Sequence, residues 1–393
     1  MYNVILKQNE EKRILNFHSW IYANEVSKIT GKDSQGSICK VLSFGGKTIG
    51  YGYINHASKI IVRMLELTNL EKSSDDYGYD YFKALISKAN NARLSLGYDN
   101  SYRVIFSESD SLPGLIVDKY DKYLSCQFLT LGMEIRKKMI IDILVDIFSP
   151  LGIYERSDVP AREKEGLKQV KQVLYGEVPE YITIYENGLK INVDIINGQK
   201  TGYFLDQQAN RLKIMNYVKD KEVLDCFCNV GGFSLCAALG GAKEVTSIDI
   251  SPRAILEVEK NAKLNNLTTI NPICKDVFAA LREYKENNKK FDVIILDPPA
   301  FTKSIDTVKE GYKGYLDINT LALKLINKGG YLITCSCSQH LTLNLFMKMI
   351  SEAIEHARCK AKLVDLSFQG KDHASLINMD EALYLKVAFI QIV

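Results

Sequence analysis

The stretch KEVLDCFCNVGGFSLCAALGGAKEVTSIDIS, residues 221–251, decides the fold that we expect for this chain. A short apolar segment ends at Asp225 and gives way to small residues at 229–232, which is typical of a buried strand followed by a tight turn. Apolar residues then recur at helical spacing from Phe233, and a second strand ends at Asp249. The order of strand, glycine turn, helix, strand and acid predicts half of a doubly wound α/β sheet.

The glycine turn predicts a nucleoside site. Adjacent glycines let the backbone approach a ligand, a helix N-terminus offers free amides, and Asp249 can accept hydrogen bonds from a ribose diol. A dinucleotide fingerprint needs three spaced glycines, and the first is missing here, so S-adenosylmethionine is favoured over NAD. A turn that only packs helix on strand is the alternative. The residues expected at the cofactor in this turn are Asn229, Gly231, Gly232 and Phe233.

Composition places the chain among soluble globular proteins. Its 393 residues exceed the length at which a single hydrophobic core keeps growing, so two or three domains are expected. A content of 46% apolar and 25% charged residues is ordinary for such proteins. Nine cysteines without framework spacing indicate a reducing, cytoplasmic compartment, and no apolar run is long enough to cross a membrane. The net charge of +3 is small, so an RNA partner would need a local basic patch.

Residues 1–70 have the rhythm of a small β-barrel domain, with short strand patterns over 37–41, 48–53 and 60–65 separated by glycines. His18, Trp20 and Tyr22 lie close together in the sequence of this part and predict a stacking platform for RNA bases. The alternative is that the only tryptophan of the chain anchors a small core.

Residues 71–188 predict a central α+β domain. Helical spacing over 81–96 precedes two strand patterns joined by a turn at 112–114. Three carboxylates here are assigned to turn and surface roles rather than to metal, because no histidine or cysteine lies near them: Glu108, Asp110 and Asp118.

Residues 189–393 predict a Rossmann-like domain. The segment GQKTGYFLDQQANR, 198–211, is interpreted as a lid over the site or as an inter-domain connection. Asp276 and Val277 follow a short strand, and the acid can accept a hydrogen bond from an adenine amine. The apolar strand FDVIIL then delivers Asp297 to the edge of the sheet where ligands bind.

A carboxylate and a thiol follow adjacent strands, at Asp297 and in the segment Cys335-Ser336-Cys337-Ser338. Methylation at carbon 5 of a pyrimidine requires this pair, because a thiolate must add to carbon 6 before carbon 5 can accept a methyl group. The acid would stabilise the charge that develops on the base. A packing role for Cys337 and a metal site built from two C-x-C pairs are the alternatives.

Several motifs along almost the whole chain resemble the RlmI-type class I methyltransferases: HSW, FSESDSLPGLIVDKY, IYERSD, GQKTGYFLDQ, NVGGFS, DPPAF, CSCS and DHASLINMDEALYLK. The resemblance implies an N-terminal PUA domain, a central α+β domain and a C-terminal methyltransferase domain that uses S-adenosylmethionine. It also implies 5-methylcytosine formation in large-subunit ribosomal RNA. The family cysteine matches Cys337, and Gln207 in the LDQ motif joins the expected cofactor residues. A homodimer is compatible with this resemblance.

The chain departs from the family at positions expected to face the substrate. Ala300, Gln208 and Leu316 stand where the family often has a basic residue, and Ala374 and Asp380 replace two usual prolines. His373 is retained near the target pocket or has a structural hydrogen-bonding role. An exocyclic amino methyltransferase and a non-catalytic RNA-binding protein on a methyltransferase scaffold remain as alternatives.

Overall fold

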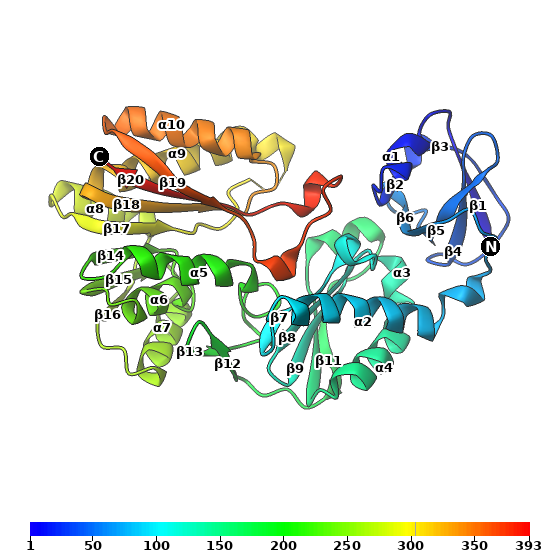
Figure 1. The fold of residues 1–393 in the computed structure, drawn as a ribbon, viewed down its shortest axis with the longest axis horizontal. Helices are drawn as coiled ribbons and strands as arrows, with labels where there is room; N and C mark the ends of the chain where they lie inside the picture. The colour runs from blue at the N-terminus through cyan, green and yellow to red at the C-terminus, as the bar shows by residue number, and fades with distance from the viewer. Residues whose placement is uncertain (303) are drawn as a thin grey trace. The chain divides into compact units, whose positions relative to one another are not determined.

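The computed structural model describes residues 1–302 and 304–393, which form two compact units (Figure 1). Unit 1 consists of Met1–Ile184, Val193–Leu205 and Lys371–Ala382. Unit 2 consists of Tyr185–Asn192, Asp206–Gly370 and Leu383–Val393. The chain therefore returns to unit 1 near its C-terminal end, which differs from the single C-terminal domain expected over 189–393.

Unit 1 begins with a six-stranded sheet in the order β2-β6-β5-β4-β1-β3. Its elements are β1 (Tyr2–Leu6), α1 (Glu11–Leu15), β2 (Trp20–Tyr22), β3 (Val26–Thr30), β4 (Ile38–Leu42), β5 (Thr48–Ile54) and β6 (Ile60–Leu67). The pair β1 and β4 is parallel, and the other pairs are antiparallel. The three strands expected from the glycine-separated patterns are confirmed as β4, β5 and β6.

The second part of unit 1 is a five-stranded sheet in the order β11-β10-β9-β8-β7. Its strands are β7 (Ser101–Phe106), β8 (Leu115–Tyr120), β9 (Tyr123–Phe128), β10 (Gly152–Ser157) and β11 (Val170–Gly176), and its main helices are α2 (Tyr79–Ser95) and α4 (Lys137–Phe148). The expected hairpin is confirmed by the antiparallel register of β7 and β8. Apolar residues of α2, α4 and this sheet form one core with Tyr51 and Tyr53 of β5. Residues 1–70 and 71–188 are therefore joined by a shared core.

Unit 2 is a seven-stranded sheet in the order β16-β15-β14-β17-β18-β20-β19. The strands are β14 (Glu222–Cys226), β15 (Glu244–Asp249), β16 (Ile270–Cys274), β17 (Phe291–Leu296), β18 (Ile326–Ser336), β19 (Ala361–Ser367) and β20 (Lys386–Ile392). The first five in this order are parallel, and β20 is antiparallel to both of its neighbours. The predicted doubly wound α/β sheet is confirmed, and the carboxyl ends of its parallel strands share one edge.

Five helices connect the strands of unit 2: α6 (Gly232–Leu239), α7 (Pro252–Leu264), α8 (Val277–Glu286), α9 (Val308–Leu325) and α10 (Leu343–Ala357). The main core of the unit lies between the sheet and α8, α9 and α10, where Tyr315, Phe346 and Phe291 are fully buried. The shorter helix α5 (Gln208–Ile214) precedes β14. No helix in the described part of the chain is long and apolar enough to cross a membrane.

Candidate active site

The turn between β14 and α6 has the backbone geometry that the sequence predicts. Asn229 and Gly231 both have positive φ, at 50° and 88°, and Gly231 caps the start of α6. A Cβ atom on Gly231 would lie 3.2 Å from the side chain of Val258, in a conformation that already disfavours larger residues. The turn therefore holds the amides at the start of α6 close to the strand ends. Contact between this turn and a cofactor stays a prediction.

Asp249 organises the same turn. Its carboxylate ends β15 and accepts hydrogen bonds from the Asn229 amide at 3.1 Å and from the Ser251 amide at 2.9 Å. These bonds fix the carboxylate beside the glycine turn, where a ribose would need an acceptor. The role on a ribose remains a prediction that the geometry supports.

Asp225 is a site residue that the sequence placed only at a strand end. Its side chain is fully buried, accepts a 2.5 Å hydrogen bond from Ser234 Oγ, and leaves Oδ1 without a hydrogen-bond partner. Burial raises the pKa of Asp225 to about 7, and the charges of Asp297 and Asp249 add to this effect. Three carboxylates thus lie at the carboxyl ends of β14, β15 and β17, namely Asp225, Asp249 and Asp297. An edge of this charge suits a ligand with cationic groups, as S-adenosylmethionine has.

This burial predicts a pH dependence of stability. The folded pKa of Asp225, about 7, lies above the ordinary aspartate value near ~3.9, so the folded protein keeps a proton that the unfolded chain releases. Without cofactor, the free energy of unfolding should therefore fall as pH rises from about 4 to about 7, by at most ~1.4 kcal/mol per pH unit. Asp225→Asn should remove this slope in urea unfolding, whereas the half-exposed Asp317→Asn should keep it. Parallel slopes in wild type and Asp225→Asn would contradict the prediction.

Asp276 and Val277 have different surroundings. Asp276 is exposed and caps α8, because its Oδ1 accepts the Ala279 amide at 2.9 Å. One oxygen of this carboxylate is therefore engaged in the helix cap, and the proposed contact with an adenine amine would use the other. The side chain of Val277 is 2% exposed and packs in the core, so its backbone is the part that a ligand could reach.

Gln207 orients the carboxylate of Asp297 through a hydrogen bond. The buried amide of Gln207 donates through Nε2 to Asp297 Oδ1 at 3.0 Å, and its Oε1 accepts from Asn210 at 2.8 Å. Asn210 also donates to the Phe368 carbonyl at 3.1 Å. The chain thus orients Asp297 through two buried amides. Gln207, expected at the cofactor, is a positioning residue for the carboxylate in this geometry.

Two cysteines at the carboxyl end of β18 differ in burial, Cys335 inside the strand and Cys337 after it. Cys335 is fully buried, and burial raises the pKa of its thiol well above the ordinary value, with Asp297 as the next contribution. Cys337 lies just beyond the strand and is partly exposed. A nucleophile must reach substrate and ionise, so the geometry favours Cys337.

Ser338 connects the loops that carry Asp297 and Cys337. Its Oγ accepts the Thr302 amide at 3.3 Å and lies 2.9 Å from the hydroxyl of Tyr315. Its carbonyl accepts a 2.8 Å hydrogen bond from Nζ of Lys386, the first residue of β20. Sequence reasoning missed Lys386, since a single lysine at the start of a strand pattern gives no signal of a site.

The arrangement of side chains bears on the metal alternative for the two C-x-C pairs. In the part of the chain that the structure describes, no group of three or more histidine, cysteine or acidic side chains is arranged to hold an ion. None of the nine cysteines, all within the described residues, forms a disulfide.

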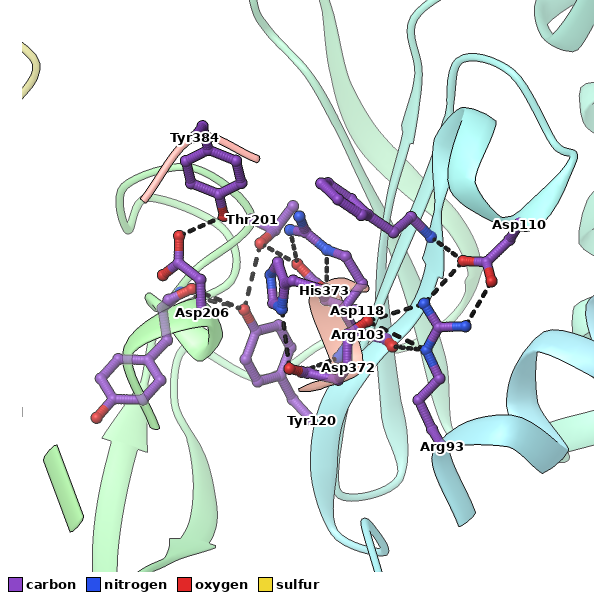
Figure 2. A network of polar contacts seen from close by, with 12 residues as sticks. Arg93, Arg103, Asp110, Asp118, Tyr120, Thr201, Asp206, Asp372, His373 and Tyr384 are labelled. Carbon is purple, nitrogen blue, oxygen red and sulfur yellow. Dashed lines mark hydrogen bonds and ion pairs between the residues drawn. The ribbon is translucent and has the colours of Figure 1, made fainter. Parts of the chain in front are cut away.

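The carboxylates of unit 1 correct one prediction. Asp118 was expected in a turn or at the surface, but it is fully buried and accepts two 2.8 Å hydrogen bonds from Arg103 (Figure 2). Asp110 pairs with Arg93, and the side chain of Glu108 is only 11% exposed. The surface assignment was wrong because the basic partners lie on α2, β6 and β7, too far away in the sequence to be recognised.

His373 belongs to the same network. Its Nδ1 lies 2.9 Å from Asp372 Oδ1, the other oxygen of Asp372 accepts the Arg103 amide at 2.9 Å, and His373 is 2% exposed (Figure 2). Arg93 also donates to the Asp372 carbonyl at 2.8 Å. These contacts seat Lys371–Ala382 on unit 1, so they favour the structural role for His373.

Trp20 follows neither simple prediction. Its ring nitrogen donates to Glu108 at 2.8 Å, and the Arg63 guanidinium lies 5.3 Å from its ring centroid. His18 contacts its edge, and burial, followed by the charge of Arg13, lowers the pKa of His18. Trp20 is therefore half-buried in a polar network, while Phe17 beside it is 67% exposed.

Comparisons with known proteins agree with this architecture. A PUA-like domain model matches residues 4–67, and an S-adenosylmethionine-dependent methyltransferase model matches residues 166–360. Ribosomal RNA large subunit methyltransferase I of Vibrio campbellii is 39% identical over 98% of this chain and 97% of its own length. The protein of the same name from Aliivibrio fischeri is 38% identical over 98% of each chain.

Solved structures agree in fold. A Streptococcus mutans protein described as an S-adenosylmethionine-dependent methyltransferase superposes with a TM-score of 0.84 over 100% of both chains, at 23% identity. A second methyltransferase structure, complexed with S-adenosylhomocysteine, gives 0.85 at the same identity and coverage. The cofactor of this class is S-adenosylmethionine, and the acidic edge and glycine turn of unit 2 fit it.

Proposed function

The chain belongs to the ribosomal RNA large subunit methyltransferase I family of S-adenosylmethionine-dependent methyltransferases, and on this premise we propose that it methylates carbon 5 of a cytosine in large-subunit ribosomal RNA. One observation carries the choice of carbon 5. The loop with Asp297 and the loop with the partly exposed Cys337 are tied together at the carboxyl edge of the sheet by the bond from the Thr302 amide to Ser338.

Each protein group has a defined part in this chemistry. The Cys337 thiolate adds to carbon 6, and the resulting enamine makes carbon 5 nucleophilic. Asp297, held by Gln207, binds the exocyclic amine and, in its protonated form, donates its proton to the adjacent ring nitrogen, which neutralises the negative charge that the adding thiolate places on the ring. Bound S-adenosylmethionine supplies the methyl group. The carbon 5 proton then passes to solvent, the electron pair of that C–H bond restores the ring double bond, and Cys337 leaves as thiolate while the ring nitrogen returns its proton to Asp297. A base stacked in a helix cannot present its face to the thiol, so the target must be single-stranded or flipped.

A mechanism-based substrate tests this proposal. RNA with 5-fluorocytosine at the target has no proton to lose at carbon 5, so the enzyme should remain covalently attached after methyl transfer. Digestion and mass spectrometry should locate the nucleotide on the Cys337 peptide. Methylation mapping of unmodified RNA should show 5-methylcytosine, and an N-methylated product would overturn the carbon 5 mechanism.

The exocyclic amino methyltransferase is the competing function, and Phe301 argues against it. Such an enzyme needs an aromatic ring directly after Asp-Pro-Pro to stack on the target base, whereas here Ala300 intervenes. The ring of Phe301 packs 4.7 Å from that of Tyr315 and also contacts Phe227 and Phe278. This partly buried ring packs against the core of unit 2 through these contacts.

RNA contacts are expected on the PUA-like domain around α1. Lys12 is exposed there, and the ring of Phe17 is exposed in a strained positive-φ conformation at 66°. An exposed ring can stack on a base, and an exposed basic side chain in the same short segment can neutralise a phosphate. The double variant Lys12→Glu, Phe17→Ala should weaken RNA binding by about tenfold or more in fluorescence anisotropy and lower the salt slope by about one.

Lys28→Glu is the matched control for this experiment, because Lys28 is exposed on β3 of the same domain. Equal losses in both variants would indicate a general effect of charge, and no loss in the double variant would place the RNA elsewhere. Point variants are preferred to deletion of residues 1–70, because that deletion would uncover the core shared by β5 and α2.

A further inference from the structure

Lys386 is a buried cation beside the expected nucleophile. It is 3% exposed, begins β20 and lies opposite Ser336 in the antiparallel register with β18. Its Nζ donates to the carbonyl of Ser338, the residue after Cys337, at 2.8 Å. The amine is thus fixed at the loop that carries the Cys337 thiol.

The residues before Lys386 hold the start of β20 in place. The hydroxyl of Tyr384 donates to Asp206 Oδ2 at 2.6 Å, and the Leu385 amide donates to Gln369 Oε1 at 3.2 Å. Both bonds are internal to unit 2. They fix the backbone at the start of β20, from which the buried Lys386 side chain reaches the Ser338 carbonyl.

In the described part of the chain, the positive charge of the Lys386 amine is not balanced by a carboxylate. Within residues 1–302 and 304–393, no carboxylate pairs with Lys386, and its hydrogen-bond acceptor is a neutral carbonyl. Burial lowers the pKa of Lys386 to about 8, and the charge of Cys337 acts in the opposite direction. Other titratable side chains near this loop are Tyr315 and Cys335, His340 on the loop itself, and Asp297 on the loop tied to it through Thr302. A neighbouring thiolate stabilises a buried cation that has no paired anion, and the cation stabilises the charged form of the thiol by the same interaction.

We propose that the Lys386 ammonium is the counter-ion that keeps Cys337 ionised, which makes Lys386 a positioning residue for the nucleophile. This inference rests on the proposed function. In the ionisation step the S–H bond breaks, the proton passes to solvent, the electron pair stays on sulfur, and the ammonium keeps its three protons. The thiolate that results is the species that adds to carbon 6. Elimination at the end of the reaction restores the same ion pair.

Alkylation of Cys337 by iodoacetamide tests the pairing without relying on catalysis. Labelling of the full chain is followed by peptide mass spectrometry from pH 5.5 to 9.5, with exposed Cys274 as the internal reference. Lys386→Met keeps the length and apolar stem but removes the charge, and Lys386→Arg keeps the charge. Lys213→Met is the control, because Lys213 pairs with Asp365 at 2.7 Å in the same unit.

We expect Lys386→Met to slow Cys337 labelling at pH 7 by about tenfold or more and to raise its pH midpoint by about one unit or more. Lys386→Arg should stay within about threefold of wild type, and Lys213→Met should match it. An unchanged midpoint in a Lys386→Met protein that still binds S-adenosylmethionine overturns the pairing. If Lys386→Met does not fold, the wild-type protein alone tests the pairing. A pH midpoint of Cys337 labelling at or above that of Cys274 then overturns the pairing.

The two proposals can fail separately. A fluorocytosine adduct on Cys337 together with a midpoint insensitive to residue 386 would refute the ion pair and leave the carbon 5 mechanism intact. A midpoint that depends on Lys386, in an enzyme whose Cys337→Ala variant still methylates, would support the ion pair and refute the mechanism.

Discussion

Replacing Cys337 by alanine should reduce methyl transfer by about a thousandfold or more, because no other protein group can add to carbon 6 and activate carbon 5. Cofactor binding should remain within about threefold of wild type, since Cys337 lies on the loop after β18 and the glycine turn follows β14. Single-turnover assays with labelled S-adenosylmethionine and calorimetry would measure these two effects.

Cys335→Ala is the matched control for this variant. Cys335 is fully buried two residues earlier in the chain, so its replacement removes a packed thiol rather than a nucleophile. This control should keep most of the activity and should still form the fluorocytosine adduct. Near-normal turnover in Cys337→Ala, or an adduct on the Cys335 peptide, would show that the nucleophile is assigned wrongly.

Replacing Asp249 by alanine should weaken S-adenosylmethionine binding by about a hundredfold, or ~2.7 kcal/mol. The variant removes an acceptor for the ribose and also releases the Asn229 and Ser251 amides that the carboxylate now holds. Calorimetry gives the dissociation constant. Asp249→Asn should weaken S-adenosylmethionine binding less than Asp249→Ala does, because the amide oxygen of asparagine can still accept one of these hydrogen bonds.

Asp292→Ala controls for the structural part of that loss. Asp292 is also a carboxylate on the same sheet that accepts a backbone amide, from Glu222 at 3.0 Å, but it lies near the start of β17. If Asp292→Ala weakens cofactor binding as much as Asp249→Ala, the effect is a general loss of sheet stability. Unchanged affinity in Asp249→Ala would remove Asp249 from the cofactor site.

The sheet of unit 2 could be predicted because its signals are local. The strand Phe291–Leu296 is the predicted run FDVIIL, since a continuous apolar run marks a strand buried on both faces. A proline opens the helix Pro252–Leu264, which is another local signal. Strand β18 begins at Ile326, before the apolar part of its sequence. Its first residues are polar and glycine-rich, so they resemble a loop in the sequence.

The sequence predicted candidate site residues only where a recognisable local pattern marks them. Asp249 and Asp297 end apolar strands, and this position alone marks them. Lys386 is brought to Ser338 from 48 positions away by the antiparallel placement of β20. Gln207 reaches Asp297 across 90 positions, and no local pattern reports such a contact.

Burial was the other property that the sequence could not give. Asp118 looks like a surface acid among turn residues, yet Arg103 satisfies it in the interior. Asp225 looks like an ordinary strand-end acid, but burial raises its pKa, and the charges of Asp297 after β17 and Asp249 at the end of β15 add to that effect. Both cases depend on packing between segments distant in the chain, which determines whether a charge is hydrated or paired.

The placement of β20 also affects how the protein can be synthesised. A ribosome produces β19 before β20, yet β19 has its described sheet partner only in β20, which lies between it and β18. Until β20 emerges from the exit tunnel, β18 has an unpaired edge and the Cys337 loop lacks the Lys386 amine. Premature termination before residue 386 should therefore yield a chain with an exposed β18 edge and an unpaired β19 segment, which is prone to aggregation.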